Sequence, residues 1–498
     1  MRLKALLLAV ILMLSAIVTA CSDQKDSGAK TTNTNDTAPA GEQETTADPD
    51  YTSDLPQRDL GGLTINFLTP NSEHDPDWAV WSPRDIYAEA ENGETINDAV
   101  FRRNRIVEEL YNVKIANDDT NDSLGKLQRA VTANDPVYDV VQMRFNTVST
   151  PMTNGYLLEV KHLPHINLEK KYWNIEATKA MTLGGHMFLL NGDIMLLDKD
   201  SSGILIFNKV MHQDFRLPNL YDMVKNYSWT LDSFYETIKG VTSDVDGDGQ
   251  LTYKDRWGFV GYRDTLPAML VSAGGLIATK DENDFPVITI LNEKELSIID
   301  KIYMIMYDNS NTFNLQKLYA QGFSAIYAEA RTMFSEHRIL YYWVRLREVE
   351  TFRGMETDFG MLPMPMYDEA QKRYYTALNS YVGTTLAAVS ICSYPEELSI
   401  VLESLAEQSH RILMPAYYDI NLTSKIARDD ESEEMLDIII STGVVDIGAV
   451  YDFGGICGQF MEMSLTDNRD IVSRMQKLMK GAEAAINRLV KGIEKIEG

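Results

Sequence analysis

The sequence has 498 residues, more than one hydrophobic core usually serves, so its length predicts at least two lobes. Its 44% content of hydrophobic residues is normal for a folded soluble protein. The 73 acidic residues outnumber the 46 basic ones and give a formal net charge of −27. This charge argues against nucleic acids and other polyanions as general partners.

The first twenty residues have the pattern of a secretory leader. Arg2 and Lys4 supply a positive flank, residues 6–17 form an apolar run too short for a confident membrane span, and small residues precede Cys21. The segment resembles the lipobox of bacterial lipoproteins, in which the cysteine takes a diacylglyceryl group and becomes the mature N-terminus. We expect a signal peptide at 1–20 and a lipid anchor on Cys21; an ordinary signal peptide with an incidental cysteine is the alternative.

A polar segment follows the cysteine. Residues 22–50 contain no branched aliphatic and no aromatic side chain. Such a composition cannot bury enough apolar surface to offset the entropy of ordering the chain. We therefore expect residues 21–55 to form a disordered tether that holds a globular body near the membrane.

From residue 56 onward, strand and helix patterns alternate. Period-two alternation predicts a first strand at 63–68, and an apolar stripe at helical spacing follows a capping box at 95–98. Strands at 113–115 and 138–143 flank a helix at 124–131. Further strands are predicted at 186–190, 194–197, 204–207, 359–365 and 386–391, and helices after Thr230 and over 471–493. This alternation indicates parallel α/β construction.

The strongest local motif is a twelve-residue acidic loop at 244–255. Acidic residues stand at its positions 1, 3, 5 and 12, with glycine at position 6, which is the spacing of an EF-hand calcium loop. The predicted ligands are Asp244, Asp246, Asp248, Gln250, Thr252 and Asp255, with Gln250 contributing its backbone carbonyl. We expect a structural Ca²⁺ here, because carboxylates this close repel one another without a cation. A solvated acidic turn without an ion is the alternative.

Signatures of enzymes are missing from the sequence. It contains no GxSxG, HExxH, Walker or dinucleotide-binding motif, and only His162 and His165 among its seven histidines lie close together. We predict no catalytic residue and no enzyme. A hydrolase stays open as an alternative, since glycosidase carboxylates need no sequence motif.

Aromatic residues gather in two places. Trp78 and Trp81 lie in a polar stretch after the first strand, and Trp343 and Tyr381 belong to a later group rich in tyrosine. Aromatic faces in a cleft suit sugars, whose C–H faces pack on rings while their hydroxyls bond polar neighbours. For Trp343, in a segment that we take as helical, burial in the core is an equal alternative.

Several short motifs, taken together in their order, resemble the family 1 extracellular solute-binding lipoproteins of bacterial ABC importers, especially those for carbohydrates. They are Asn154-Gly155-Tyr156-Leu157-Leu158-Glu159, Ile206-Phe207-Asn208-Lys209, Trp229-Thr230-Leu231-Asp232, Arg256-Trp257-Gly258-Phe259, Phe359-Gly360-Met361-Leu362-Pro363 and Ala427-Arg428-Asp429-Asp430-Glu431-Ser432. The resemblance covers the whole chain after the tether. Some members place a calcium-binding loop where 244–255 stands.

The resemblance implies a two-lobed α/β fold of the periplasmic-binding-protein type II class, with a hinge and a cleft between the lobes. Each lobe would be discontinuous: 56–165 with 312–378, and 166–311 with 379–498. Residues at the crossings and strand ends would face the cleft and bind the ligand: Trp78, Trp81, Asn146, Asp193, Glu336, Trp343, Asn379 and Tyr381.

The function that the resemblance implies is capture of a mono- or oligosaccharide and its delivery to the permease of an ABC importer. The protein would be a monomer, anchored by lipid at the extracytoplasmic face of the cell membrane. A carbohydrate-active hydrolase and a receptor for a non-sugar solute such as a peptide are the alternatives. The sequence leaves open whether Cys392 and Cys457 pair.

Overall fold

The structure is a computed structural model that describes residues 53–72, 79–356, 358–423, 430–466 and 468–497. The predicted signal peptide, the lipidation site Cys21, almost all of the tether and the predicted ligand residue Trp78 lie outside these ranges. The body, Leu55–Gly498, is one compact unit and is described by itself. Within the described residues, no helix combines the length and the apolar character that crossing a membrane requires.

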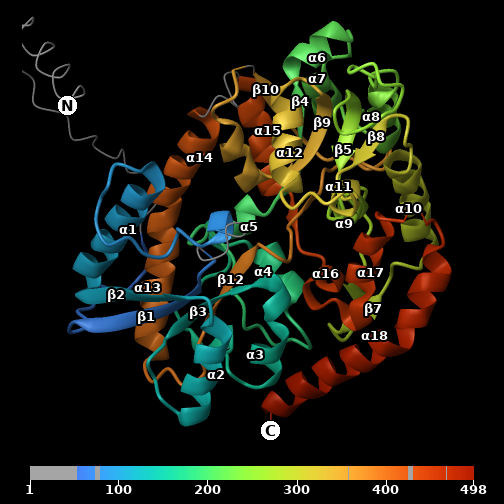
Figure 1. Ribbon diagram of the computed structural model, residues 1–498. Coiled ribbons are helices and arrows are strands. Elements are labelled where there is room, and N and C mark those ends of the chain that lie inside the picture. The colour runs from blue at the N-terminus through green and yellow to red at the C-terminus, as the bar shows by residue number, and fades with distance from the viewer. Residues whose placement is uncertain (1–52, 73–78, 357, 424–429, 467, 498) are drawn as a thin grey trace, which may run out of the picture. The chain divides into compact units, whose positions relative to one another are not determined.

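The first sheet has four strands in the order β12-β3-β1-β2 (Figure 1). These are β1 (Leu63–Pro70), β2 (Val113–Thr120), β3 (Val140–Arg144) and β12 (Thr384–Ala388). β1 runs parallel to β2 and β3, whereas β12 is antiparallel to β3. Helices α1 (Thr95–Tyr111), α2 (Ser123–Ala133) and α13 (Pro395–Gln408) accompany this sheet, and α1 packs against α13.

The second sheet has five strands in the order β10-β4-β9-β5-β8. They are β4 (Gly203–Asn208), β5 (Trp257–Gly261), β8 (Thr312–Asn314), β9 (Ile339–Arg345) and β10 (Phe359–Pro363). β5 runs parallel to both β8 and β9, and every residue of these five strands is buried. Around it lie α8 (Leu231–Ile238), α9 (Thr265–Ser272), α10 (Glu293–Met306), α12 (Ile326–Ser335) and α15 (Asp430–Ser441).

This strand pairing does not match the predicted division into lobes. β8, β9 and β10 fall within 312–378, which was assigned to the first lobe, yet they pair with β4 and β5. β12 falls within 379–498, which was assigned to the second lobe, yet it pairs with β3. The chain instead passes from the first sheet to the second just before β4, and it returns between β10 and β12.

A third connection is helical. α13 continues through a π-helical turn at Ser409–Leu413 into α14 (Met414–Thr423), and Figure 1 shows this long helix running from the first sheet towards the second. α15 then packs against β10. Three connections between two sheets therefore hold the halves of the body together.

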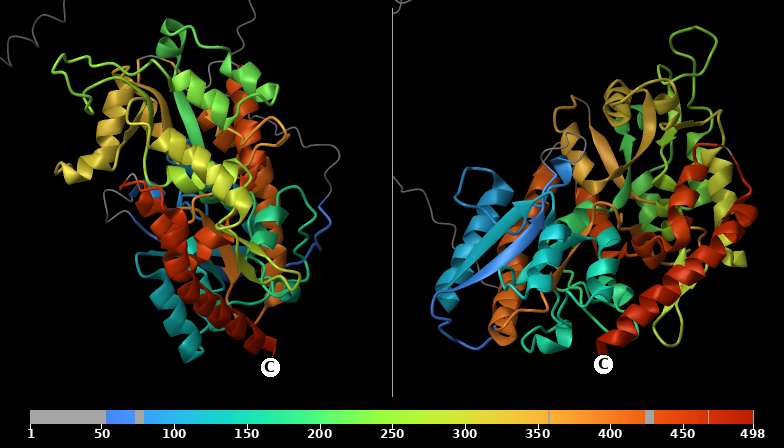
Figure 2. Two further views of the ribbon diagram at one scale, coloured as in Figure 1. Left: turned by 90° about the vertical axis from the view of Figure 1, so that its right-hand side faces the viewer. Right: turned by 60° about the horizontal axis from the view of Figure 1, so that its bottom comes forward.

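The C-terminal part is helical, as predicted. α16 (Ile447–Tyr451), α17 (Ile456–Met463) and α18 (Ile471–Glu494) follow one another, and α18 runs along one side of the body to the C-terminus (Figure 2). The remaining elements are short: α3 (Ser149–Thr153), α4 (Ile175–Met181), α5 (Leu197–Asp200), α6 (Lys209–Asp214), α7 (Leu220–Lys225), α11 (Lys317–Ala320), β6 (Ala278–Lys280), β7 (Pro286–Ile288), β11 (Thr376–Ala377) and β13 (Gly443–Val444). The strand predicted at 186–190 forms only isolated bridges, at His186 and Leu190, and the one predicted at 194–197 is wrong, because Leu197 begins α5.

Asp446 caps α16 with a fully enclosed carboxylate, which accepts hydrogen bonds from the backbone N–H groups of Ile277 and Gly448. Burial raises the pKa of Asp446 from 3.8 to about 6. Between these values the folded state holds more protons than the unfolded state, so the contribution of Asp446 to the free energy of unfolding falls as pH rises.

We expect that fall to be on the order of 2 kcal/mol between pH 4 and pH 7. Urea unfolding of the wild type and Asp446→Asn across this range measures it, because the asparagine variant lacks the titration. A difference between the two proteins that stays constant with pH would contradict the prediction.

Candidate functional site

A cavity of about 410 Å³ lies at the carboxyl ends of strands from both sheets. The parallel strands β5, β8 and β9 end at one edge of the second sheet, and the segment after β1 meets that edge from the first. Open α/β sheets bind ligands at this place, outside the carboxyl ends of their strands. The lining residues are Val80, Trp81, Arg263, Asp264, Gln316, Tyr319, Ser324, Ala325, Tyr327, Ala328, Arg331, Arg345, Glu348, Thr351 and Tyr381.

Arg345, the last residue of β9, is the central charged group of this cavity. Its Nε lies 3.1 Å from Glu348 Oε2, and its Nη1 lies 3.8 Å from Asp264 Oδ2. Burial opposes its charge, but Glu348 outweighs that effect and raises the pKa of Arg345 above its ordinary value. Burial also raises the pKa of Asp264. A buried guanidinium thus holds two carboxylates in fixed positions at the cavity wall.

Aromatic rings form the other part of the wall. The Arg345 guanidinium lies 4.7 Å from the centre of the Trp81 ring, within the range of a cation–π contact. Behind the wall, the buried ring of Tyr262 packs edge to face against Tyr327 at 5.2 Å and Trp343 at 4.8 Å, although Tyr262 itself lines neither cavity. Rings beside carboxylates and a guanidinium combine flat apolar faces with groups that bond hydroxyls.

A smaller cavity of about 30 Å³ adjoins the first and shares Asp264 and Tyr381 with it. Within the part of the chain that the structure describes, Asp264 Oδ1 and Trp343 Nε1 are buried without hydrogen-bond partners, and both residues line this space. Its volume suits one group of the size of a water molecule. An acceptor and a donor there can bond a single hydroxyl from both sides.

The structure brings four of the predicted ligand residues to these cavities. Trp81 and Tyr381 line the larger one, and Trp343, Asn379 and Tyr381 line the smaller one. Trp343 lies in strand β9, not in a helix as the sequence suggested.

Two predicted residues lie apart from both cavities. Glu336 stands exposed at the end of α12 and pairs with Arg338 at 2.6 Å, which corrects its placement in the cleft. Asn146 is exposed; its backbone N–H donates to the carbonyl of Ser380, but the residue lines neither cavity.

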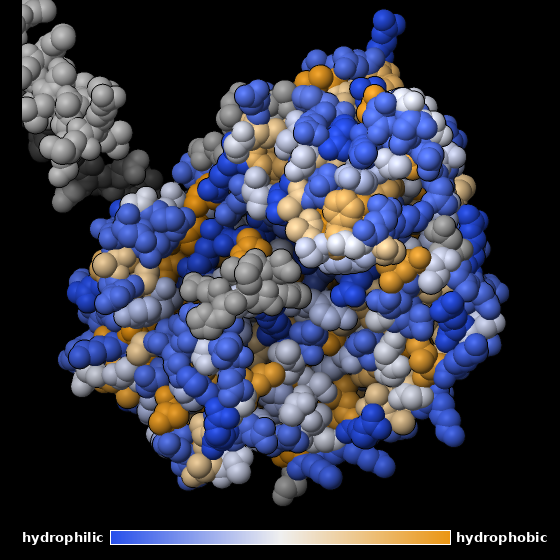
Figure 3. Space-filling view, in the orientation of Figure 1, coloured by the Kyte–Doolittle hydropathy of each residue, from blue (hydrophilic) through white to orange (hydrophobic). Residues whose placement is uncertain are grey.

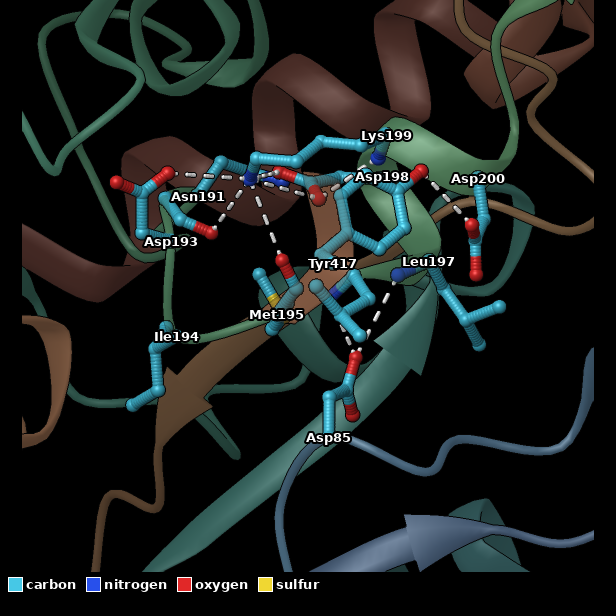
Figure 4. Close-up of polar contacts among 12 residues, drawn as sticks. Asp85, Asn191, Asp193, Ile194, Met195, Leu197, Asp198, Lys199, Asp200 and Tyr417 are labelled. Atoms are coloured by element: carbon cyan, nitrogen blue, oxygen red, sulfur yellow. Dashed lines mark hydrogen bonds and ion pairs between the residues drawn. The ribbon is translucent and has the colours of Figure 1, made fainter. Parts of the chain in front are cut away.

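Asp193 belongs to a different polar cluster, drawn in Figure 4. Its carboxylate lies 2.6 Å from His410 Nδ1. It also lies 3.4 Å from Lys199 Nζ, the contact that Figure 4 draws. The Lys199 ammonium also donates to the backbone carbonyls of Gly192 and Met195, towards which it points. These bonds fix the segment that leads from the first sheet into β4, beside a separate cavity of about 310 Å³.

Sequence reasoning missed Asp264, Glu348, Arg345, Tyr327 and Arg331 as site residues. A signal for three of them was present, because Asp264 lies three residues after the end of β5, Arg345 ends β9 and Glu348 lies three residues after it. Polar residues placed after buried parallel strands indicate a site.

The acidic loop brings together three of its predicted ligands. Carboxylate oxygens of Asp244, Asp246 and Asp255 all lie within 4.8 Å of one another. Burial raises the pKa of Asp255, but hydrogen bonds from the backbone N–H groups of Thr252 and Val245 lower it overall. Hard oxygen donors at this spacing fit a calcium ion.

The other predicted ligands do not belong to this group of three carboxylates. Asp248 is outside the group of three and accepts a hydrogen bond from the backbone N–H of Gln250. The Thr252 hydroxyl donates to Asp255.

The two cysteines of the body do not pair. Cys392 and Cys457 are both free thiols, and burial raises the pKa of Cys392 to about 11.

No protein-family model and no curated protein matches this chain. Solved structures do. A sugar transporter protein of Rhizobium etli in an open conformation matches with a TM-score of 0.56 at 12% identity, over 87% of this chain and 99% of that one. A second match is the galacto-N-biose-/lacto-N-biose I-binding protein of the ABC transporter of Bifidobacterium longum, in complex with lacto-N-biose. Its TM-score is 0.54 at 11% identity, over 86% of this chain and 99% of that one.

UspC of M. tuberculosis matches with a TM-score of 0.54 at 13% identity, over 85% of this chain and 100% of that one. Each match spans both sheets, because it covers more than four fifths of either chain. The chain therefore shares the fold of these proteins, which confirms the predicted two-lobed, periplasmic-binding-protein-like α/β class.

Proposed function

We propose that this protein captures a mono- or oligosaccharide in the cavity at the strand ends and delivers it to the permease of an ABC importer. The observation that carries the proposal is the composition of the cavity wall. Tyr319 and Tyr327 offer rings to the C–H faces of a sugar, beside the buried ring of Trp81. Asp264, Glu348 and Arg345 offer acceptors and donors to its hydroxyls. The sugar named with the protein of B. longum supports the same class of ligand.

The wall argues for binding rather than hydrolysis. Glu348 and Asp264 both contact the one guanidinium of Arg345, whereas the carboxylate pair of a glycosidase flanks the glycosidic bond that it cleaves. The binding protein should return its ligand unchanged.

A thermal-shift screen tests the proposal. Neutral and acidic mono- and oligosaccharides, together with peptides and nucleosides, are added to the purified protein, and each stabilising sugar is recovered and analysed. We expect one class of saccharide to raise Tm and to be recovered intact. Stabilisation by a peptide but by no sugar would contradict the carbohydrate assignment, and cleavage of the sugar would contradict the assignment as a non-enzyme.

The placement of the protein in the cell is part of the proposal. We infer that Cys21 carries the lipid, that residues 21–55 form the tether and that the body stands at the extracytoplasmic face as a monomer. Figure 3 supports the monomer, because hydrophilic residues dominate the face shown and hydrophobic ones form small separate patches. Cys21→Ser should move the protein from the membrane fraction to the soluble fraction of cells; retention in the membrane would contradict the lipid anchor.

We also propose that the loop 244–255 binds a structural Ca²⁺, on the strength of its spacing and of the three converging carboxylates. A ligand present at a hundred times its Kd stabilises the folded state by about 2.7 kcal/mol. Calcium should therefore raise Tm of the wild type, and chelation should reverse the rise.

The matched variants are Asp246→Asn in the loop and Asp281→Asn in another exposed acidic turn. Asp246→Asn should abolish the calcium-dependent rise in Tm, whereas Asp281→Asn should keep it. No response of the wild type to calcium would contradict the ion site, and so would an unchanged response of Asp246→Asn.

A further inference from the structure

The larger cavity holds more positive than negative side chains, although the whole chain has a net charge of −27. Three guanidinium groups line it, those of Arg263, Arg331 and Arg345, against the two carboxylates of Asp264 and Glu348. In a protein with so many acidic residues, such a local excess of positive charge in the proposed ligand site favours a negatively charged ligand.

The two carboxylates of the wall both face arginine side chains of the same wall. The guanidinium of Arg345 donates two hydrogen bonds to Glu348, at 3.1 and 3.3 Å. Asp264 lies 3.8 Å from both Arg345 Nη1 and Arg263 Nε. Arg263 also lies 3.4 Å from the half-exposed Glu462. Every acidic group of the wall is thus directed at Arg345 or Arg263.

Arg331, on α12, is left without such a partner. Among the described residues it makes neither a hydrogen bond nor an ion pair, yet it lines the cavity and is only partly exposed. The planar fork of a guanidinium fits a carboxylate with two parallel hydrogen bonds, and a partly enclosed site strengthens that pairing.

The charge is negative at the junction with the smaller cavity. There Asp264 Oδ1, which lies 3.8 Å from Arg263 Nε but accepts no hydrogen bond, can accept one from a hydroxyl of the ligand. We therefore propose, on the basis of the proposed sugar-binding function, that the ligand is an acidic carbohydrate: a saccharide whose hydroxyls meet Asp264 and Trp343 and whose carboxylate pairs with Arg331. A uronic acid unit has this combination of groups.

Isothermal titration calorimetry with matched sugars tests the inference. The probes are digalacturonate and its neutral counterpart digalactose, glucuronate and glucose, and a sulfated disaccharide as a second kind of anion. A uronate should bind about ten- to a hundredfold more tightly than its neutral counterpart, as one charged pair allows. Its affinity should fall with added NaCl, whereas the affinity of a neutral sugar should not.

Arg331→Met should remove most of the preference for the uronate and leave the neutral sugar nearly unchanged, and Arg331→Lys should restore part of it. Arg488→Met, an exposed arginine on α18, is the control and should change nothing. Unchanged Tm of Arg331→Met without ligand shows that the variant folds.

The outcomes separate the two proposals. If no saccharide binds, the proposed function itself fails. If neutral sugars bind as tightly as uronates, or if Arg331→Met keeps the preference, only the inference of an acidic ligand is overturned. If only the sulfated sugar bound, the proposal that the ligand carries a carboxylate would be overturned, although the cavity would still be a site for an anion.

Discussion

Replacement of Arg345 by methionine should lower the free energy of unfolding by about 3–5 kcal/mol, because it leaves charged groups buried without their partner. Arg345 is 7% exposed. It is the cationic partner of Glu348, and it shares the carboxylate of Asp264 with Arg263. Urea unfolding of the wild type and the variant measures the loss, and the sugar affinity of the variant should fall with it.

A second variant separates lost charge from lost packing. In Arg345→Met with Glu348→Gln, one buried charge is gone, so part of the stability should return. Arg102→Met removes an exposed ion pair to Glu91 and should change stability by less than about 1 kcal/mol. An effect of Arg345→Met as small as that of Arg102→Met would show that the buried cluster contributes little.

Trp81→Ala should destabilise the protein by about 3–5 kcal/mol, the usual range for removal of a buried aromatic ring. Trp81 is 3% exposed, packs with Leu197 and Val382 from the segments that connect the two sheets, and lies under the guanidinium of Arg345. The same substitution removes a ring from the proposed sugar site, so ligand affinity should fall as well.

Trp81→Phe is the matched control, because it keeps a ring in the same place and should retain more than half of the lost stability. Denaturant unfolding of the wild type and both variants measures the free energy of unfolding, and calorimetric titration of the same three proteins measures the sugar affinity. If Trp81→Ala unfolded like the wild type, the ring would not be part of the packed contact between the sheets.

The sequence predicted the fold class but not the membership of each sheet. Apolar and polar residues alternate in 63–67, where buried Ile65 and Phe67 flank a half-buried Asn66. The strands at 312–314, 339–345 and 359–363 are buried throughout and carry no such pattern. Their partners are set by pairings over long stretches of chain, such as Met361 with Ile206. Local patterns hold no information on such pairs.

The site was predicted in part, and the reasons differ by residue. Trp81 was identified as an aromatic side chain in a polar stretch. Tyr381 was identified from its tyrosine-rich group and its place at an expected crossing between the lobes, and both residues line the cavity. Glu336 was misplaced because its segment ends a helix rather than a strand. Arg345 was missed because its segment was taken as helical, which hid its place at the end of a buried strand, and because its ion pair with Glu348 forms only in the folded chain.

The most direct test of sugar capture is calorimetric titration of the stabilising saccharide into the wild type, Tyr327→Ala and Tyr87→Ala. Tyr327 lines the larger cavity, whereas Tyr87 is exposed and lines neither cavity of the site. Sugar capture in the cavity predicts one binding site per chain in the wild type, a Kd raised about tenfold or more in Tyr327→Ala, and an unchanged Kd in Tyr87→Ala. Equal affinity of all three proteins, or no saturable binding of any saccharide by the wild type, would contradict it.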